Sequence, residues 1–121
     1  MSAGRRVVVT GIGAVTCFGM GVDRLWKGLV DGRSGRASIA AFDASAYRSD
    51  VAAEVPLDAW RQYSADSTQL PYPTDAATCY TQAAADEAIR DAGLAAQNLA
   101  GAGCMLGTLS SADRGLRAAG F

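Results

Sequence analysis

The chain has 121 residues, of which 50% are hydrophobic and 19% are charged, and its formal net charge at pH 7 is −1. This length supports one modest hydrophobic core and is too short for two domains. The charge balance argues against a basic nucleic-acid-binding protein, and the hydrophobic fraction argues against a disordered chain. No stretch approaches the roughly 20 apolar residues that span a membrane.

The first predicted element is the β-branched run Val7–Val9, which shows no polar alternation. This pattern is typical of a parallel strand that is buried on both faces. It indicates an α/β protein in which this strand is central.

A helix is predicted to follow the first strand. Its apolar residues recur with helical spacing at Val22, Leu25, Trp26 and Leu29. Asp23 lies in the first turn, where the helix macrodipole favours a carboxylate. Gly32 and Gly35 mark the end of this helix.

The middle of the chain holds a second strand candidate and a loop. The strand is predicted over Val51–Val55 and is stopped by Pro56. The polar residues Ser64–Pro73 include two prolines and predict a surface loop.

A second helix is predicted from Thr74, a good N-cap, to about Ala92, with Gly93 as its left-handed cap. Its small residues include Ala83, Ala84, Ala85 and Ala88. They permit the close approach of another backbone, or they only reflect high helix propensity, and both interpretations stay open.

A third apolar run, Cys104–Leu106, lies between two glycines and suits another central strand. A short helix is predicted over Asp113–Ala119. Central strands need cover on both faces and neighbours on both edges, but the sequence offers only about two substantial helices. We therefore expect the isolated chain to expose apolar surface and to be poorly soluble or oligomeric.

The loop TGIG, Thr10–Gly13, lies between a predicted strand and a predicted helix and suggests a dinucleotide-binding site. The spacing argues against this interpretation. A GxGxxG pattern that begins at Gly11 has Thr16 in place of its third glycine, and a TGxxxGxG pattern has Val15 and Cys17 in place of its later glycines. The alternative is that these glycines serve tight turns and close packing.

The three cysteines, Cys17, Cys79 and Cys104, are odd in number and widely spaced. They match neither a disulfide framework nor a CxxC metal or redox motif, and a cytoplasmic location is expected. Arg5 and Arg6 precede an apolar run, as in a secretory signal, but glycines interrupt that run, so no signal peptide is expected.

Several short signatures occur in order along the chain: RRVVVTGIGAV (Arg5 to Val15), Gly19, LWKGLVDGRSG (Leu25 to Gly35), FDASAYRSDVAAEV (Phe42 to Val55), DAGL (Asp91 to Leu94) and GCMLGT (Gly103 to Thr108). Their order and spacing resemble the amino-terminal portion of a β-ketoacyl-acyl-carrier-protein synthase, and the segment from Phe42 to Glu54 is most similar to type II polyketide ketosynthases. The resemblance covers the first third or less of a complete family member.

The resemblance implies an α/β protein with a thiolase-like layered fold, of which residues 1–121 form the amino-terminal portion of the synthase domain. It also implies decarboxylative condensation of a malonyl-carrier protein with an acyl group held on an enzyme cysteine. That chemistry needs a thiolate activated at a helix N-terminus and two histidines. Because the 121 residues contain no histidine, we expect no catalytic residue and no activity from this chain alone.

All three cysteines are interpreted as structural. Cys17 is predicted in a loop, Cys79 inside the second helix, and Cys104 in an apolar strand where burial leaves the thiol inert. The resemblance places the turn Thr108–Ser111 beside an acyl tunnel, so Leu109 and Ser110 are candidate pocket-lining residues, with a solvated connecting turn as the alternative.

The resemblance further implies an acyl carrier protein as partner, together with a homodimer or a full-length ketosynthase. We expect no cofactor and no metal. The sequence leaves open whether the pathway makes fatty acids or polyketides. Two other functions stay open: a non-catalytic partner subunit similar to chain-length factors, and a small NAD(P)-dependent reductase.

Overall fold

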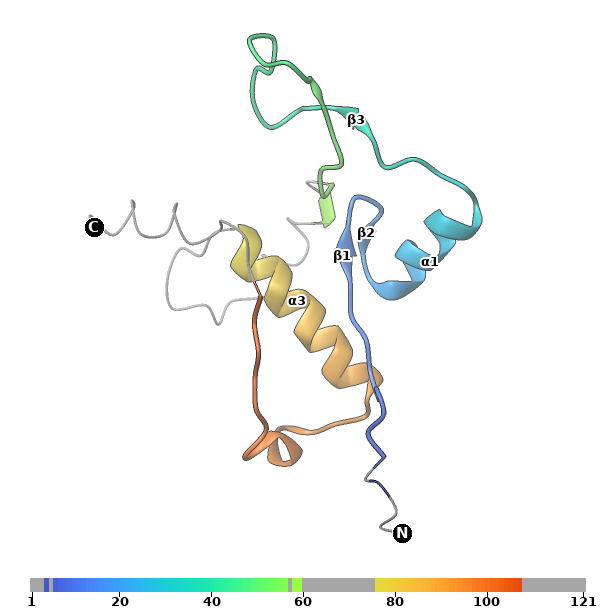
Figure 1. Cartoon of the computed structure of the whole chain (residues 1–121), viewed down its shortest axis with the longest axis vertical. Coiled ribbons are helices and arrows are strands. Elements are labelled where there is room, and N and C mark those ends of the chain that lie inside the picture. Colours follow the sequence, from blue (N-terminus) through green and yellow to red (C-terminus); the bar gives the residue numbers. More distant parts are fainter. Residues whose placement is uncertain (1–3, 5, 57, 60–75, 108–121) are drawn as a thin grey trace, which may run out of the picture.

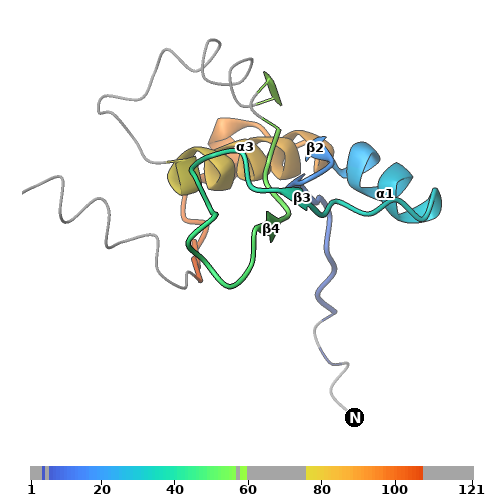
Figure 2. The same cartoon turned by 90° about the horizontal axis from the view of Figure 1, so that it is seen from above.

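A computed structural model of the chain describes residues 4, 6–56, 58–59 and 76–107. Its elements in chain order are β1 (Val15–Thr16), β2 (Gly19–Met20), α1 (Val22–Val30), β3 (Ala37–Ser38), β4 (Val51–Ala52), α3 (Ala76–Asp91) and the 3-10 helix η1 (Ala96–Leu99). The described part is therefore mixed α/β, as the sequence predicts, with small sheets and helices of unequal length (Figures 1 and 2).

Both sheets are antiparallel pairs of two strands. Val15 of β1 lies opposite Met20 of β2, and Ala37 of β3 lies opposite Ala52 of β4. The strand predicted over Val51–Val55 is thus confirmed only in its first two residues.

The glycine ends predicted for both helices are confirmed. After α1, Gly32 has a φ of 63°, its N–H donates to the Leu29 carbonyl, and the N–H of Arg33 donates to the Gly28 carbonyl. The same pair of bonds recurs after α3, where Gly93 has a φ of 66°. These are Schellman caps, which a glycine in the left-handed region permits without steric cost.

The prediction that Val7–Val9 form a buried central strand is wrong. The segment forms no strand, and its three valines are 88%, 69% and 82% exposed. A parallel strand exists only when a neighbouring strand forms hydrogen bonds with its N–H and C=O groups. Within the described residues, no backbone of another segment pairs with this run.

The prediction of a central strand at Cys104–Leu106 is also wrong. These residues form no strand, and Met105 is fully exposed. Figure 1 shows this segment and the amino-terminal segment apart, with α3 between them in that view. The two runs therefore do not pair with each other as neighbouring strands.

Close packing of glycine against α3 decides between the two interpretations of its alanines. A Cβ placed on Gly13 would collide with the carbonyl of Ala84, and a Cβ placed on Gly11 would collide with the backbone of Ala88 and Ala92. The small residues of α3 thus let the extended backbone of residues 11–13 lie against the helix.

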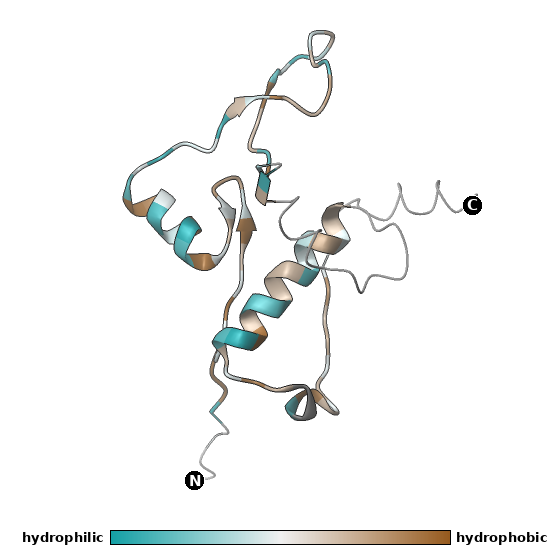
Figure 3. Cartoon of the chain, turned by 180° about the vertical axis from the view of Figure 1, so that it is seen from behind, coloured by the Kyte–Doolittle hydropathy of each residue, from teal (hydrophilic) through white to brown (hydrophobic). Residues whose placement is uncertain are grey.

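The described part has a small core. Its buried hydrophobic residues are Ala44, Ala59, Cys79 and Ala83, and no large side chain among the described residues is fully buried. Figure 3 shows hydrophobic stretches along the extended segment near the amino terminus. The expected exposure of apolar surface is confirmed.

Within the described part, no helix has the length and apolar character needed to cross a membrane.

The predicted loop Ser64–Pro73, the predicted N-cap Thr74 and the predicted helix Asp113–Ala119 lie outside the described residues.

Candidate functional site

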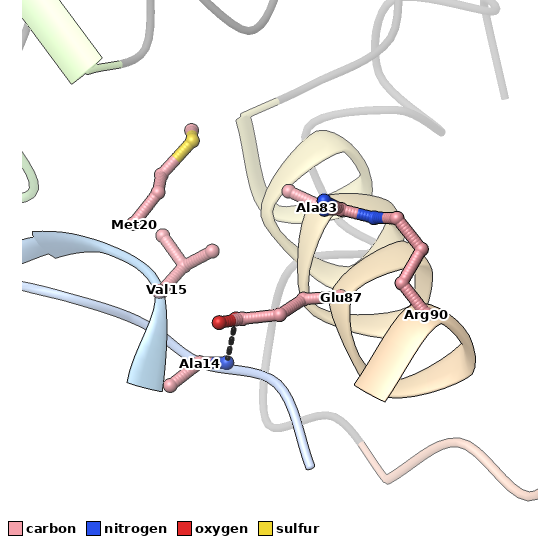
Figure 4. A pocket seen from close by; sticks show the side chains of 7 residues that line it. Ala14, Val15, Met20, Ala83, Glu87 and Arg90 are labelled. Atoms are coloured by element: carbon pink, nitrogen blue, oxygen red, sulfur yellow. Dashed lines mark hydrogen bonds between the residues drawn. The ribbon is translucent and has the colours of Figure 1, made fainter. Parts of the chain in front are cut away.

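Among the described residues, polar contacts between distant segments gather where α3 meets residues 12–22, which run from the glycine loop through the β1–β2 hairpin to the start of α1. The Glu87 carboxylate on α3 accepts two backbone hydrogen bonds from this segment. Its Oε2 accepts the N–H of Ala14 at 2.9 Å, and its Oε1 accepts the N–H of Val22 at 2.8 Å. Figure 4 shows the side chain reaching from the helix to Ala14. One carboxylate therefore ties α3 both to the approach to β1 and to the first residue of α1.

A second carboxylate extends this contact by one helical turn. Oδ2 of Asp91 accepts the N–H of Ile12 at 3.0 Å. Residues four positions apart lie on the same face of a helix, which is why Glu87 and Asp91 both reach the loop. Together they bind three backbone N–H groups between residues 12 and 22.

The loop takes this shape because glycines allow it. Gly19 and Gly21 have φ values of 111° and 103°, which other residues rarely adopt. The N–H of Gly21 donates to the Ala14 carbonyl at 2.8 Å and closes the loop around the β1–β2 hairpin.

The N-terminus of α1 has no side-chain cap of its own. Its N-cap residue is Gly21, which makes no side-chain hydrogen bond. A helix begins with unpaired N–H groups and a partial positive charge, both of which favour a nearby anion. Glu87 meets this need from another helix.

Two cavities lie beside Glu87 and Arg90. One measures about 190 Å³ and is lined by Ala14, Val15, Met20, Gly21, Ala83, Glu87 and Arg90 (Figure 4). The other measures about 450 Å³ and is lined by Ile12, Val22, Asp23, Glu87, Arg90 and Asp91. Neither lining includes a thiol, a hydroxyl or an imidazole. The carboxylates of Glu87 and Asp91 already accept backbone N–H groups, so this arrangement serves to bind and orient groups.

These contacts support turns and close packing as the role of the loop glycines. In a dinucleotide site, backbone N–H groups and the helix N-terminus would face a pyrophosphate. Here the N–H groups of Ala14 and Val22 already donate to Glu87.

The three cysteines differ in their exposure to solvent. Cys17 is half-buried in the turn between β1 and β2, and Cys79 is buried inside α3, as predicted. The prediction that Cys104 is buried in a strand is wrong, because its thiol is exposed. Residues 104–106 form no strand, so no neighbouring strand covers the Cys104 thiol.

A third cavity, of about 490 Å³, lies between the β3–β4 region and α3. It is lined by Cys17, Gly35, Ala37, Ser38, Ala40, Ala41, Glu54, Val55, Pro56 and Tyr80. Burial, and to a lesser degree the neighbouring Cys79, raise the pKa of Tyr80 above its ordinary value. The carboxylate of Glu54 accepts the N–H groups of Ala40 and Ala41 at 2.8 and 3.3 Å, so it holds the wall of the cavity in place.

Leu109 and Ser110 lie outside the described residues. They are the two residues predicted from the sequence to line an acyl pocket. Sequence reasoning in turn missed Glu87 and Asp91. The signal that could have identified them is a pair of carboxylates spaced i, i+4 on the helix whose alanines suggested close approach to another backbone.

Comparison with known proteins decides the family. The family described as "Beta-ketoacyl synthase, N-terminal domain" matches residues 4–119. The chain belongs to the β-ketoacyl synthase family. The resemblance stated from the sequence motifs is thereby confirmed.

Three relatives illustrate the range of this family. The chain is 42% identical over 90 residues to "Granaticin polyketide putative beta-ketoacyl synthase 2" of Streptomyces violaceoruber, covering 74% of this chain and 21% of the relative. It is 36% identical over 116 residues to the tetracenomycin polyketide synthase ketoacyl synthase alpha subunit of Streptomyces glaucescens, covering 94% of this chain and 27% of the relative. It is 47% identical over 51 residues to 3-oxoacyl-[acyl-carrier-protein] synthase 2 of Coxiella burnetii, covering 42% of this chain and 12% of the relative.

The chain thus spans between 21% and 27% of the length of the first two of these relatives. No solved structure matches the chain.

Proposed function

We propose that residues 1–121 are the amino-terminal portion of a type II β-ketoacyl synthase with a thiolase-like layered fold. They supply scaffold for the decarboxylative condensation of a malonyl-carrier protein with an acyl thioester, and they carry none of its reactive groups. The observation that carries this proposal is the family match over residues 4–119 in a stretch that contains no histidine.

The three thiols support the same proposal. A condensing nucleophile needs the field of a helix N-terminus or a cationic partner to form its thiolate. Cys17 lies in a hairpin turn, Cys79 lies inside α3, and Cys104 lies in an extended segment, so none of them lies at a helix N-terminus.

In this proposal, Leu109 and Ser110 line the acyl pocket. The protein acts in the cytoplasm, and its partner is an acyl carrier protein.

The test is an assay of the purified 121-residue chain with malonyl-carrier protein and acyl-carrier protein. We expect no condensation product and no stoichiometric labelling by cerulenin, a cysteine-directed inhibitor of ketosynthases. Because the thiol of Cys104 is exposed to any reagent in solution, the Cys104→Ser variant is the matched control for non-specific labelling. Stoichiometric cerulenin labelling of Cys17 or Cys79 in that variant would overturn the proposal.

A second candidate is a non-catalytic partner subunit similar to chain-length factors. The uncovered valines of residues 7–9 and the fully exposed Met105 favour it, because exposed apolar segments are typical of interaction surfaces. The partner would be a full-length ketosynthase or a second copy of the chain. Co-expression with a tagged full-length synthase tests it: co-purification at equal amounts supports a partner subunit, and a monodisperse chain without partner affinity contradicts it.

A further inference from the structure

The cavity of about 490 Å³ between the β3–β4 region and α3 has no part in the scaffold role. Its volume falls within the range of small-molecule sites. Most of its lining is alanine, glycine, valine and proline, and four polar side chains join them, from Cys17, Ser38, Glu54 and Tyr80. An apolar cavity with a few polar groups is the usual form of a ligand site.

The charge of the lining selects the kind of ligand. Glu54 is half-buried, and the N–H groups of Ala40 and Ala41 hold its carboxylate in place. The lining contains no lysine or arginine, and no basic side chain among the described residues forms an ion pair with Glu54. Because both donors are neutral, the negative charge remains, so the cavity attracts cations and repels anions.

Two further features favour an organic cation over a metal ion. Within the part of the chain that the structure describes, no three His, Cys, Asp or Glu side chains are placed to hold a metal. Tyr80 of α3 brings an aromatic ring to the lining, and Val55 and Pro56 bring apolar side chains. Aromatic rings attract quaternary ammonium groups, whose methyl groups also suit apolar surroundings.

We propose that this cavity binds a free small alkylammonium ion, of the size and charge of choline, with Glu54 as its counter-charge and Tyr80 as its aromatic contact. The methyl groups of the ligand lie against Val55 and Pro56. The site binds the ion without chemical change. The proposal goes beyond the scaffold role and does not depend on condensation activity.

Equilibrium dialysis of the full 121-residue chain with radiolabelled choline tests the proposal. We expect saturable binding at one site per chain. The control ligand is the uncharged carbon isostere of choline, in which a tert-butyl group replaces the trimethylammonium group. It should compete about tenfold less well than unlabelled choline, since it has the same shape without the charge. Absence of saturable binding, or equal competition by the two compounds, would overturn the proposal.

Phosphatidylcholine vesicles separate a free ion from a lipid headgroup. They carry the same trimethylammonium group at a bilayer surface, and at an equal concentration of that group they should not displace choline. Displacement by the vesicles would assign the site to a membrane surface and refute the proposal of a free ion.

Glu54→Gln should raise the half-saturating choline concentration about tenfold, because the amide keeps the size of the side chain and loses its charge. Asp50→Asn is the matched control. It removes the same charge from an exposed residue next to β4 that does not line the cavity, and it should leave choline binding unchanged. Equal effects of the two variants would mean that net charge attracts choline, contrary to the proposal. If Glu54→Gln does not fold, the comparison of choline with its isostere on the unchanged chain still decides.

The thiol of Cys17 reports where choline binds, because it is half-buried and lines the same cavity. In the Cys104→Ser variant, choline at about ten times its half-saturating concentration should slow the alkylation of Cys17 by iodoacetamide about tenfold. Cys79 is buried outside this lining and should keep its rate. Mass spectrometry of the two peptides measures both rates. Saturable choline binding with an unchanged Cys17 rate would place the ligand elsewhere and contradict the proposal.

Discussion

The side chain of Glu87 and the backbone of Val22 form a 2.8 Å hydrogen bond between α3 and the first residue of α1, across 65 positions of sequence. The same carboxylate binds Ala14. The Glu87 side chain therefore joins α3 both to α1 and to the residue before β1.

Glu87→Gln should lower the free energy of unfolding by about 2 kcal/mol, because an amide replaces the charged acceptor of two bonds and its NH2 group meets a backbone donor. Asp91→Asn should cost less, about 1 kcal/mol, because Asp91 accepts a single exposed bond. Urea unfolding followed by circular dichroism measures both. A larger loss for Asp91→Asn than for Glu87→Gln would contradict the bridging role.

Gly13→Ala should destabilise the chain by about 1–3 kcal/mol, because its Cβ collides with the Ala84 carbonyl and the backbone must move away from α3. Gly103→Ala is the matched control, since a Cβ there meets no atom within 4 Å. Thermal unfolding of the two variants should differ clearly. Equal stability would show that residues 11–13 do not lie against α3.

The ionisation of Tyr80 should lower stability at alkaline pH. Burial raises its pKa above the ordinary value of 10.0, so the folded state favours the neutral phenol. This contribution is fully present below the pKa of the unfolded chain and is lost as pH rises through the raised folded value. Spectrophotometric titration of the phenolate, with the urea-unfolded chain as reference, should show a late-ionising component that the Tyr80→Phe variant lacks.

Cys79→Ala provides the control for that titration. The neighbouring Cys79 is the smaller of the two causes that raise the pKa of Tyr80. Its removal should bring the late titration part of the way back towards the ordinary value. A complete return would mean that burial is not the main cause.

NADPH at millimolar concentration should cause no saturable quenching of the fluorescence of the exposed Trp26 on α1. The N–H of Val22, at the start of that helix, already donates to Glu87, and the carboxylates of Glu87 and Asp91 repel phosphates. Free tryptophan at the same absorbance corrects for light absorbed by the cofactor. Saturable quenching beyond that correction would support the reductase function.

Val8→Glu should reduce self-association of the chain, because a charge in the uncovered valine run blocks strand addition and apolar contact. Val30→Glu is the matched control: it makes the same charge change at an exposed valine at the end of α1. Analytical ultracentrifugation over a range of concentrations distinguishes them. Equal effects would mean that net charge, rather than the segment, controls association.

The sequence by itself determined the two helices, their glycine ends and the family. The bonds of a helix and of its Schellman cap join residues three to five positions apart, so Gly32 and Gly93 act on neighbours that any short window of sequence contains. The motifs of the family are likewise local, and their order along the chain was enough to identify it.

Only the tertiary structure decided what the apolar runs and the carboxylates do. Val7–Val9 and Cys104–Leu106 have the composition of central strands, but a strand needs a partner from elsewhere in the chain, and composition does not reveal whether one is there. In the same way, nothing in the local sequence distinguishes Glu87 from an ordinary helix residue, and only the packing of residues 12–22 against α3 shows its role. Its role depends on a contact across 65 positions, and such contacts are set by packing rather than by local sequence.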